Sequence, residues 1–197
     1  MTKTKDKILD CAQGLMLTKG FEATSLEDIC QKAGVTKGGF FHYFKSKEDL
    51  GKVLLERFCC SSRLAMQNCC CHGNADKDPL KRIYSYIDFA KNMAREVVKG
   101  KGCLIGTFAQ ELSESHPGIR SLCAQGFDEW AKVLTKDIKD AKAKYAPRAS
   151  FDANSLAEHF IAVVEGSQIL AKAKKDRRVV AKNMQYFRQH IQSLFKK

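Results

Sequence analysis

The sequence lacks several features that would assign it to common classes of protein. No run approaches the roughly eighteen apolar residues of a membrane span, and the N-terminal segment MTKTKDKILD has no apolar core typical of a signal peptide. No nucleophile elbow, phosphate-binding loop or metal-ligand spacing occurs, and the five histidines stand singly. We therefore expect a cytoplasmic protein that is not an enzyme and needs no cofactor.

Cysteine is abundant, but its placement does not indicate a disulfide framework. The chain holds nine cysteines, and several are adjacent in sequence. Without a secretion signal, reduced thiols are the better expectation. The run from Cys69 to His72 invites a metal-site interpretation, but no second CxxC or HxxxH pair completes a tetrahedral shell. We expect no metal.

The net charge of +12 suits a nucleic-acid partner, although its distribution does not locate the binding site. Residues 1–57 hold ten Lys/Arg against eight Asp/Glu, whereas residues 58–197 hold twenty-four against fourteen. Most basic residues of the C-terminal part are interpreted as solvated faces of helices.

Residues 24–50 predict two short helices joined by a tight turn, and the rest of the chain is organised around them. The first helix has apolar residues at i, i+3, i+4 and i+7, namely Leu26, Ile29, Cys30 and Ala33. Ser25 is expected to cap this helix, with Asp28 completing a capping box, and Gly34 to end it.

The second helix is predicted over residues 37–44, with Thr36 as its cap. Gly38 and Gly39 in its first turn let the backbone approach a partner closely, and a helix N-terminus suits a phosphate. This pattern indicates a helix-turn-helix whose second helix enters a DNA groove.

The periodicity of the remaining chain predicts only helices, about nine in total, and therefore an all-α fold. We expect a three-helix DNA-binding domain over residues 1–50 and an effector-sensing and dimerisation domain over residues 51–197. A connecting helix over about residues 46–68 begins in the first domain and ends outside it.

The last two helices have the four-three spacing of a helical bundle. Such a pair can pack within one chain, but at the end of an otherwise complete helical domain it favours a two-fold four-helix dimer interface. The residues assigned to this homodimer interface are Leu156, Phe160, Val163, Gly166, Ser167, Leu170, Met184, Phe187, Ile191 and Leu194.

Three consecutive stretches, residues 21–29, 33–44 and 45–50, resemble the N-terminal DNA-binding domain of the TetR family of bacterial transcription regulators. The resemblance covers the first quarter of the chain, and the rest matches the family in architecture. Residues 102–111 also resemble a segment found in one broad subgroup.

The resemblance implies roles for nine residues. It places phosphate contacts at the start of the first helix of the motif and at the start of the connecting helix. It places base reading at the start of the second helix and contacts with the DNA backbone farther along that helix. In that order the residues are Thr24 and Ser25, Lys47, Thr36, Lys37, Gly38 and Gly39, and His42 and Tyr43. Phe41 departs from the tyrosine common in the family, and Gly39 stands where threonine or serine is common.

An effector pocket is expected to be apolar, with a few polar groups. The candidates are Phe89, Met93, Cys103, Phe108, Cys123, Phe127 and Trp130, each of which is alternatively a packing residue. Cys103 follows two lysines and begins a predicted helix, so positive charge and the helix dipole favour its thiolate. A reactive thiol sensor and a small packing residue both remain open for it.

Together these features predict a DNA-binding transcriptional regulator, most simply a repressor that binds a palindromic double-stranded operator as a homodimer and is released by a small molecule or by thiol modification. The alternatives are a helical protein that binds nucleic acid without sequence preference and without an effector, and a small helical enzyme. The sequence names neither the effector nor the operator.

Overall fold

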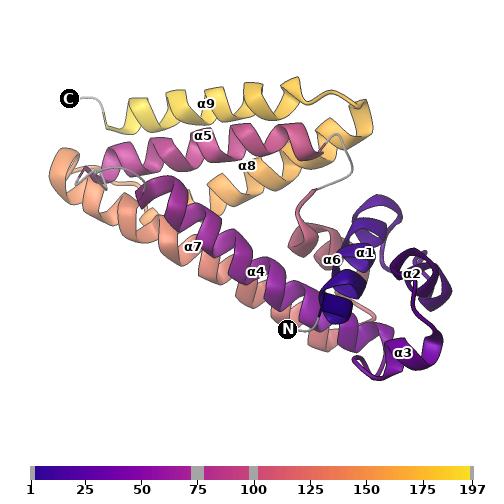
Figure 1. Cartoon of the computed structure of the whole chain (residues 1–197). Coiled ribbons are helices and arrows are strands. Elements are labelled where there is room, and N and C mark those ends of the chain that lie inside the picture. The colour runs from indigo at the N-terminus through magenta and orange to yellow at the C-terminus, as the bar shows by residue number, and fades with distance from the viewer. Residues whose placement is uncertain (1–2, 72–77, 98–101, 196–197) are drawn as a thin grey trace. The chain divides into compact units, whose positions relative to one another are not determined.

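The computed structural model describes residues 3–71, 78–97 and 102–195 (Figure 1). Within these ranges every regular element is an α-helix, which confirms the predicted all-α fold. The helices are α1 (Lys3–Lys19), α2 (Leu26–Ala33), α3 (Lys37–Phe41), α4 (Lys47–Cys71), α5 (Pro79–Val97), α6 (Leu104–Leu112), α7 (Pro117–Tyr145), α8 (Ala153–Lys174) and α9 (Arg178–Leu194). Among the described residues, no helix has both the length and the apolar character needed to cross a membrane.

The chain divides into two compact units that are discontinuous in sequence. Unit 1 comprises residues 1–60 and 100–126, and unit 2 comprises residues 61–99 and 127–197. The helices α4 and α7 therefore each supply residues to both units. This division differs from the boundary predicted at residue 50, because α6 and the first part of α7 belong with the DNA-binding helices.

Local capping signals set the ends of the short helices in unit 1. The Ser25 hydroxyl accepts a hydrogen bond from the Asp28 amide, and the Asp28 carboxylate accepts one from the Ser25 amide, which is the predicted capping box. Gly34 ends α2 with a left-handed φ of 64°. Thr36 then caps α3 by accepting a hydrogen bond from the Gly39 amide at 3.1 Å.

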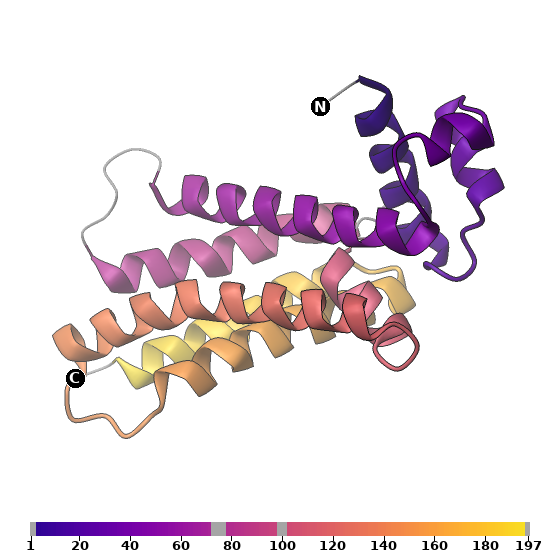
Figure 2. The same cartoon turned by 90° about the horizontal axis from the view of Figure 1, so that it is seen from below.

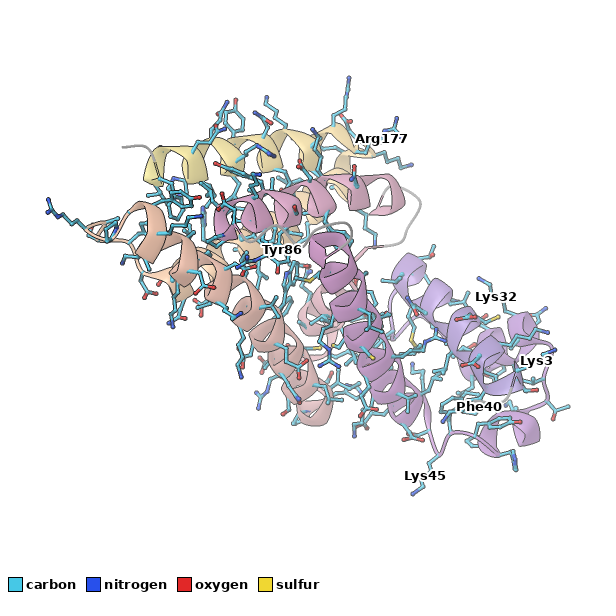
Figure 3. The ribbon with its side chains drawn as sticks, turned by 60° about the vertical axis from the view of Figure 1, so that its left-hand side comes forward. Lys3, Lys32, Phe40, Lys45, Tyr86 and Arg177 are labelled. Carbon is cyan, nitrogen blue, oxygen red and sulfur yellow. The ribbon has the colours of Figure 1, made fainter. Side chains whose placement is uncertain are left out.

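The core of unit 1 is built around aromatic rings. Phe40 and Phe44 are buried with their ring centroids 5.5 Å apart, and Figure 3 shows Phe40 pointing into the unit. Phe21 meets Phe108 of α6 edge to face at 5.4 Å. A Cβ on Gly51 would lie 3.0 Å from the Phe21 ring, so α4 approaches this ring at a glycine. The core thus fixes α6 against the loop that precedes α2.

Unit 2 is a bundle in which α8 and α9 lie side by side in both views (Figures 1 and 2) and α5 packs on them. Six of the ten residues predicted for the dimer interface are at most 6% exposed in the single chain, namely Leu156, Phe160, Ser167, Met184, Phe187 and Ile191. The four-three spacing of these residues is therefore explained by packing within one chain, which was the alternative to a dimer interface. They are already covered and leave little surface for a partner.

A buried polar cluster joins α5 to α7 within unit 2. The Arg82 guanidinium donates to Asp137 Oδ1 through Nε at 2.9 Å and Nη2 at 2.7 Å, and the Tyr86 hydroxyl donates to Asp137 Oδ2 at 3.1 Å. The hydrogen bonds to Asp137 raise the pKa of Arg82 above its usual value. Asp137 is 5% exposed and is therefore a buried charge held by its partners.

Candidate nucleic-acid interface

The second helix of the motif is shorter than the sequence predicted. It spans Lys37–Phe41 rather than residues 37–44, and His42 is its C-cap. Two glycines in five residues give little intrinsic helix stability, so packing rather than propensity determines its length. Phe40 and Phe44 remain anchored in the core, which fixes the orientation of the exposed side chains between them.

The exposed side of α3 carries most of the residues assigned to DNA. Thr36, Lys37, Gly38 and His42 are exposed and Gly39 is half-buried. Lys45, four residues after α3, also extends away from the ribbon, as Figure 3 shows. The structure therefore leaves the predicted residues 36–38 and 42 accessible at α3, and it adds Lys45, which was not predicted.

Lys37, the predicted base reader, forms an ion pair with Glu27 of α2. Both side chains are more than 60% exposed. The hydrogen bond from Lys37 lowers the pKa of Glu27, and the same bond raises the pKa of Lys37. A base or phosphate that binds Lys37 therefore competes with a carboxylate.

Thr24 and Ser25 differ in their availability. Thr24 is fully buried, and its hydroxyl donates to the Gly20 carbonyl at 2.6 Å. This burial favours a role in the turn before α2 instead of the predicted phosphate contact. Ser25 is exposed at the N-terminus of α2, where a capping hydroxyl still has a proton to donate to a phosphate.

Lys47, the other predicted phosphate contact, is engaged within unit 1. Its Nζ donates to the Phe21 carbonyl at 3.1 Å and lies 4.5 Å from the centroid of the Phe21 ring. Glu22 is also within 3.8 Å, and the Lys47 side chain is only 24% exposed. Lys47 therefore holds the turn between α1 and α2 in this structure.

Three aromatic residues complete the surface. The rings of His42 and Tyr43 meet edge to face with centroids 4.8 Å apart, and Tyr43 is half-buried. Phe41, which was not among the predicted DNA contacts, is 51% exposed. Its place four residues after Lys37, on the same face of a helix, is the signal that would have included it.

The residues predicted for an effector pocket fall in both units. Phe108 and Cys123 are buried in unit 1, and Cys103 is half-buried there. Phe127, Trp130 and Phe89 pack partly against the core of unit 2. The side chain of Met93 lies outside the described residues.

None of the described cysteines is joined in a disulfide, and their surroundings differ. Burial, with a smaller effect from Cys59, raises the pKa of Cys123 to about 11. Cys103 is the N-cap of α6 and makes no side-chain capping hydrogen bond. The lysines at 99 and 101 and the side chains of residues 69–72 lie outside the described residues. Within the part that is described, no three His, Cys, Asp or Glu side chains are grouped to hold a metal.

Comparison with known proteins covers both parts of the chain. Residues 8–52 match the family model described as bacterial regulatory proteins of the tetR family, and residues 79–187 match the tetracyclin repressor-like C-terminal domain. The HTH-type transcriptional repressor DhaR of Mycobacterium sp. (strain GP1) is 27% identical over 176 residues, which are 89% of this chain and 86% of DhaR.

Solved structures show the same fold. A regulatory protein TetR from Rhodobacter sphaeroides has a TM-score of 0.85 at 24% identity, over 96% of this chain and 99% of that one. The reduced form of NemR from E. coli has a TM-score of 0.80 at 21% identity, over 99% of this chain and 98% of that one. With family models matching at both ends, the chain belongs to the TetR family and is a DNA-binding transcriptional regulator rather than an enzyme.

Proposed function

We propose that this regulator is a cytoplasmic repressor that binds a palindromic operator as a homodimer and is released when an effector or a thiol-reactive compound acts on it. The observation that carries the proposal is the surface of α3, which exposes Lys37, Phe41 and His42 on a helix anchored by buried rings. Curated relatives named as repressors, DhaR and NemR, support the sign of regulation.

The roles on this surface follow from side-chain chemistry. In the proposal Lys37 donates to guanine edges in the major groove, and the exposed ring of Phe41 offers an apolar contact to a thymine methyl group. Ser25 and His42 donate to phosphates that set the register, and the Thr36 hydroxyl lies beside Lys37 at the start of the helix that reads bases. With Gly38 and Gly39 adding no side-chain donor, few residues read bases, so shape and two half-sites supply the rest.

The test of sequence reading is selection of bound duplexes from a random pool. Lys37→Ala should weaken binding to the selected site about tenfold and change the recovered sequence, because a good base contact supplies about 1–3 kcal/mol. The control is Lys136→Ala, which removes an equal charge from an exposed site in unit 2 and should leave both unchanged. Equal losses for Lys37→Ala on the selected site and on random duplex would show phosphate binding only, the behaviour of the non-specific alternative.

The proposed dimer surface keeps Gly166 and Leu170 from the residues first assigned to it and adds two exposed neighbours, Ile169 and Tyr186. The first three lie on α8, where Gly166 is half-buried, and Tyr186 lies on α9. Ile169, Leu170 and Tyr186 are 47%, 45% and 60% exposed. A Cβ on Gly166 would meet nothing within 4 Å, so a partner helix has room to approach there.

Sedimentation equilibrium tests this surface. Leu170→Glu should shift the protein from dimer to monomer, because it places a charge at the centre of an apolar interface. Leu64→Glu is the matched control, since Leu64 is 52% exposed on α4, outside the proposed dimer surface. A Leu170→Glu protein that stays dimeric at micromolar concentration would exclude this surface.

The proposed thiol response rests on Cys103, a half-buried cysteine at the N-cap of α6. The helix N-terminus favours its thiolate. The description of one relative's crystal structure as a reduced form is in keeping with redox-sensitive chemistry in that protein. Alkylation with N-ethylmaleimide should weaken operator binding in the wild type and in Cys60→Ser, but not in Cys103→Ser. Unchanged operator affinity after complete modification of Cys103 would leave a non-covalent small molecule as the effector.

A further inference from the structure

One carboxylate of α6 holds the turn that leads into the helix-turn-helix. Glu111 Oε2 accepts a hydrogen bond from the Phe21 amide, and Oε1 accepts one from the Glu22 amide, both at 2.8 Å. The two amides belong to the connection between α1 and α2 and have no helical partner of their own. Glu111 is an exposed residue, and its carboxylate makes a bidentate, directional contact with two adjacent amides.

The turn is shaped to receive this carboxylate. Gly20 has a φ of 92°, and a Cβ built there would lie 2.9 Å from Glu111 Oε1 and 3.0 Å from Oε2. A side chain at residue 20 would therefore be strained and would collide with the carboxylate. Glycine at this position permits both the backbone conformation and the close approach.

The same turn is held from its other side by α4. Lys47 donates to the Phe21 carbonyl at 3.1 Å, so the backbone of one residue is bound by an acid from α6 and a base from α4. The Phe21 ring is also fixed by Phe108 of α6 at 5.4 Å and by His116 at 5.6 Å. Thr24, which immediately precedes the cap of α2, is tied to the Gly20 carbonyl. Movement of the turn would therefore move the start of α2.

From this geometry we propose that Glu111 is a positioning residue through which α6 sets the orientation of the DNA-reading helices. The inference rests on the proposed release by modification at Cys103, which begins the same helix about 12 Å away along its axis. A shift of this short helix acts on the turn directly through the carboxylate. Lys47 holds the same turn through the Phe21 carbonyl, a role distinct from the phosphate contact that the family resemblance implied.

The test compares Glu111→Ala and Glu111→Gln with Glu114→Ala, which removes an exposed charge just beyond the end of α6. Amide exchange at residues 21 and 22 should accelerate about tenfold or more in Glu111→Ala, because a charged hydrogen bond is lost at each. The operator affinity of folded Glu111→Ala should be about tenfold lower than that of the wild type. Glu111→Gln keeps one acceptor oxygen, so its operator affinity should lie between those of Glu111→Ala and the wild type. Glu114→Ala should match the wild type in both measurements.

The decisive measurement is the ratio of operator dissociation constants after and before N-ethylmaleimide treatment. If Glu111 transmits the effect of alkylation, this ratio should be large in the wild type and in Glu114→Ala. It should approach one in Glu111→Ala. A Glu111→Ala protein whose amides exchange faster but whose ratio equals that of the wild type would show a purely structural turn contact and overturn the inference.

If the wild type does not respond to alkylation, the proposed thiol release fails, and the positioning role is decided separately. It then stands only if Glu111→Ala weakens operator binding about tenfold at a temperature where thermal unfolding shows that Glu111→Ala and Glu114→Ala are both folded. Operator affinity within twofold of the wild type would refute it.

Discussion

Replacing Asp137 with alanine should destabilise unit 2 strongly, because this buried carboxylate accepts hydrogen bonds from both Arg82 and Tyr86. The Arg82 side chain is 20% exposed and that of Asp137 is 7% exposed, so the guanidinium would face an apolar side chain with little water to replace its partner. Breaking a buried pair from one side costs about 3–5 kcal/mol. For a chain of this size, that corresponds to a fall in Tm of roughly 6–20 °C.

Asp140→Ala is the matched control, because Asp140 lies one turn along α7 and also faces Arg82, at 3.6 Å, but its side chain is 50% exposed. An exposed pair of this kind contributes about 0–1 kcal/mol. Circular dichroism during thermal unfolding measures the change in Tm of both variants. The protomer concentration is held fixed, because the Tm of a protein that dimerises depends on it. Equal shifts for the two variants would refute the assignment of the stability to burial of the Asp137 cluster.

Three further predictions concern unit 1. Glu27→Gln should tighten operator binding about two- to fivefold, because it releases Lys37 from its exposed ion pair. Fluorescence anisotropy should show that this gain in affinity becomes smaller at high salt, and weaker binding by Glu27→Gln would contradict the prediction. A lysine hydrogen bond and the capping amide lower the pKa of Asp28, so its stabilising effect is present above the unfolded pKa of about 3.9 and is lost as the pH falls through it and below. Asp28→Asn should therefore melt lower than the wild type at pH 7, with the difference vanishing in acid; a constant difference would argue against this origin. Burial raises the pKa of Cys123 to about 11, so iodoacetamide at pH 8 should modify Cys123 at least about a hundredfold more slowly than exposed Cys60. Mass spectrometry measures both rates, and equal rates would contradict this prediction.

The features that sequence reasoning predicted correctly are those whose partners lie close along the chain. The capping box of Ser25 and Asp28, the left-handed Gly34 and the cap at Thr36 each involve residues at most four positions apart. Such signals act through the local backbone, and they need no knowledge of tertiary packing. The helix-turn-helix was recognisable for this reason.

The features that were missed depend on distant partners. Lys47 matched a phosphate contact by its place in the motif, but its partner Phe21 lies 26 residues earlier, and Glu111 lies 90 residues after the amide that it binds. The spacing of α8 and α9 was also ambiguous, because apolar residues at four-three intervals suit packing within a chain and between chains equally. Burial of Met184 and Phe187 in the core of unit 2 distinguishes the two cases, and it is visible only in three dimensions.

The discontinuity of unit 1 has a consequence for synthesis of the protein. Phe21 leaves the ribosome long before Glu111, from which it is separated by 90 residues, and at about 5–20 residues per second the interval is roughly 5 to 18 s. Until then, the turn before α2 has neither the carboxylate for its amides nor the Phe108 ring against Phe21. An N-terminal fragment that stops before α6 never acquires the Glu111 carboxylate or the Phe108 ring. The DNA-reading helices therefore reach their final arrangement only after more than half of the chain has been made.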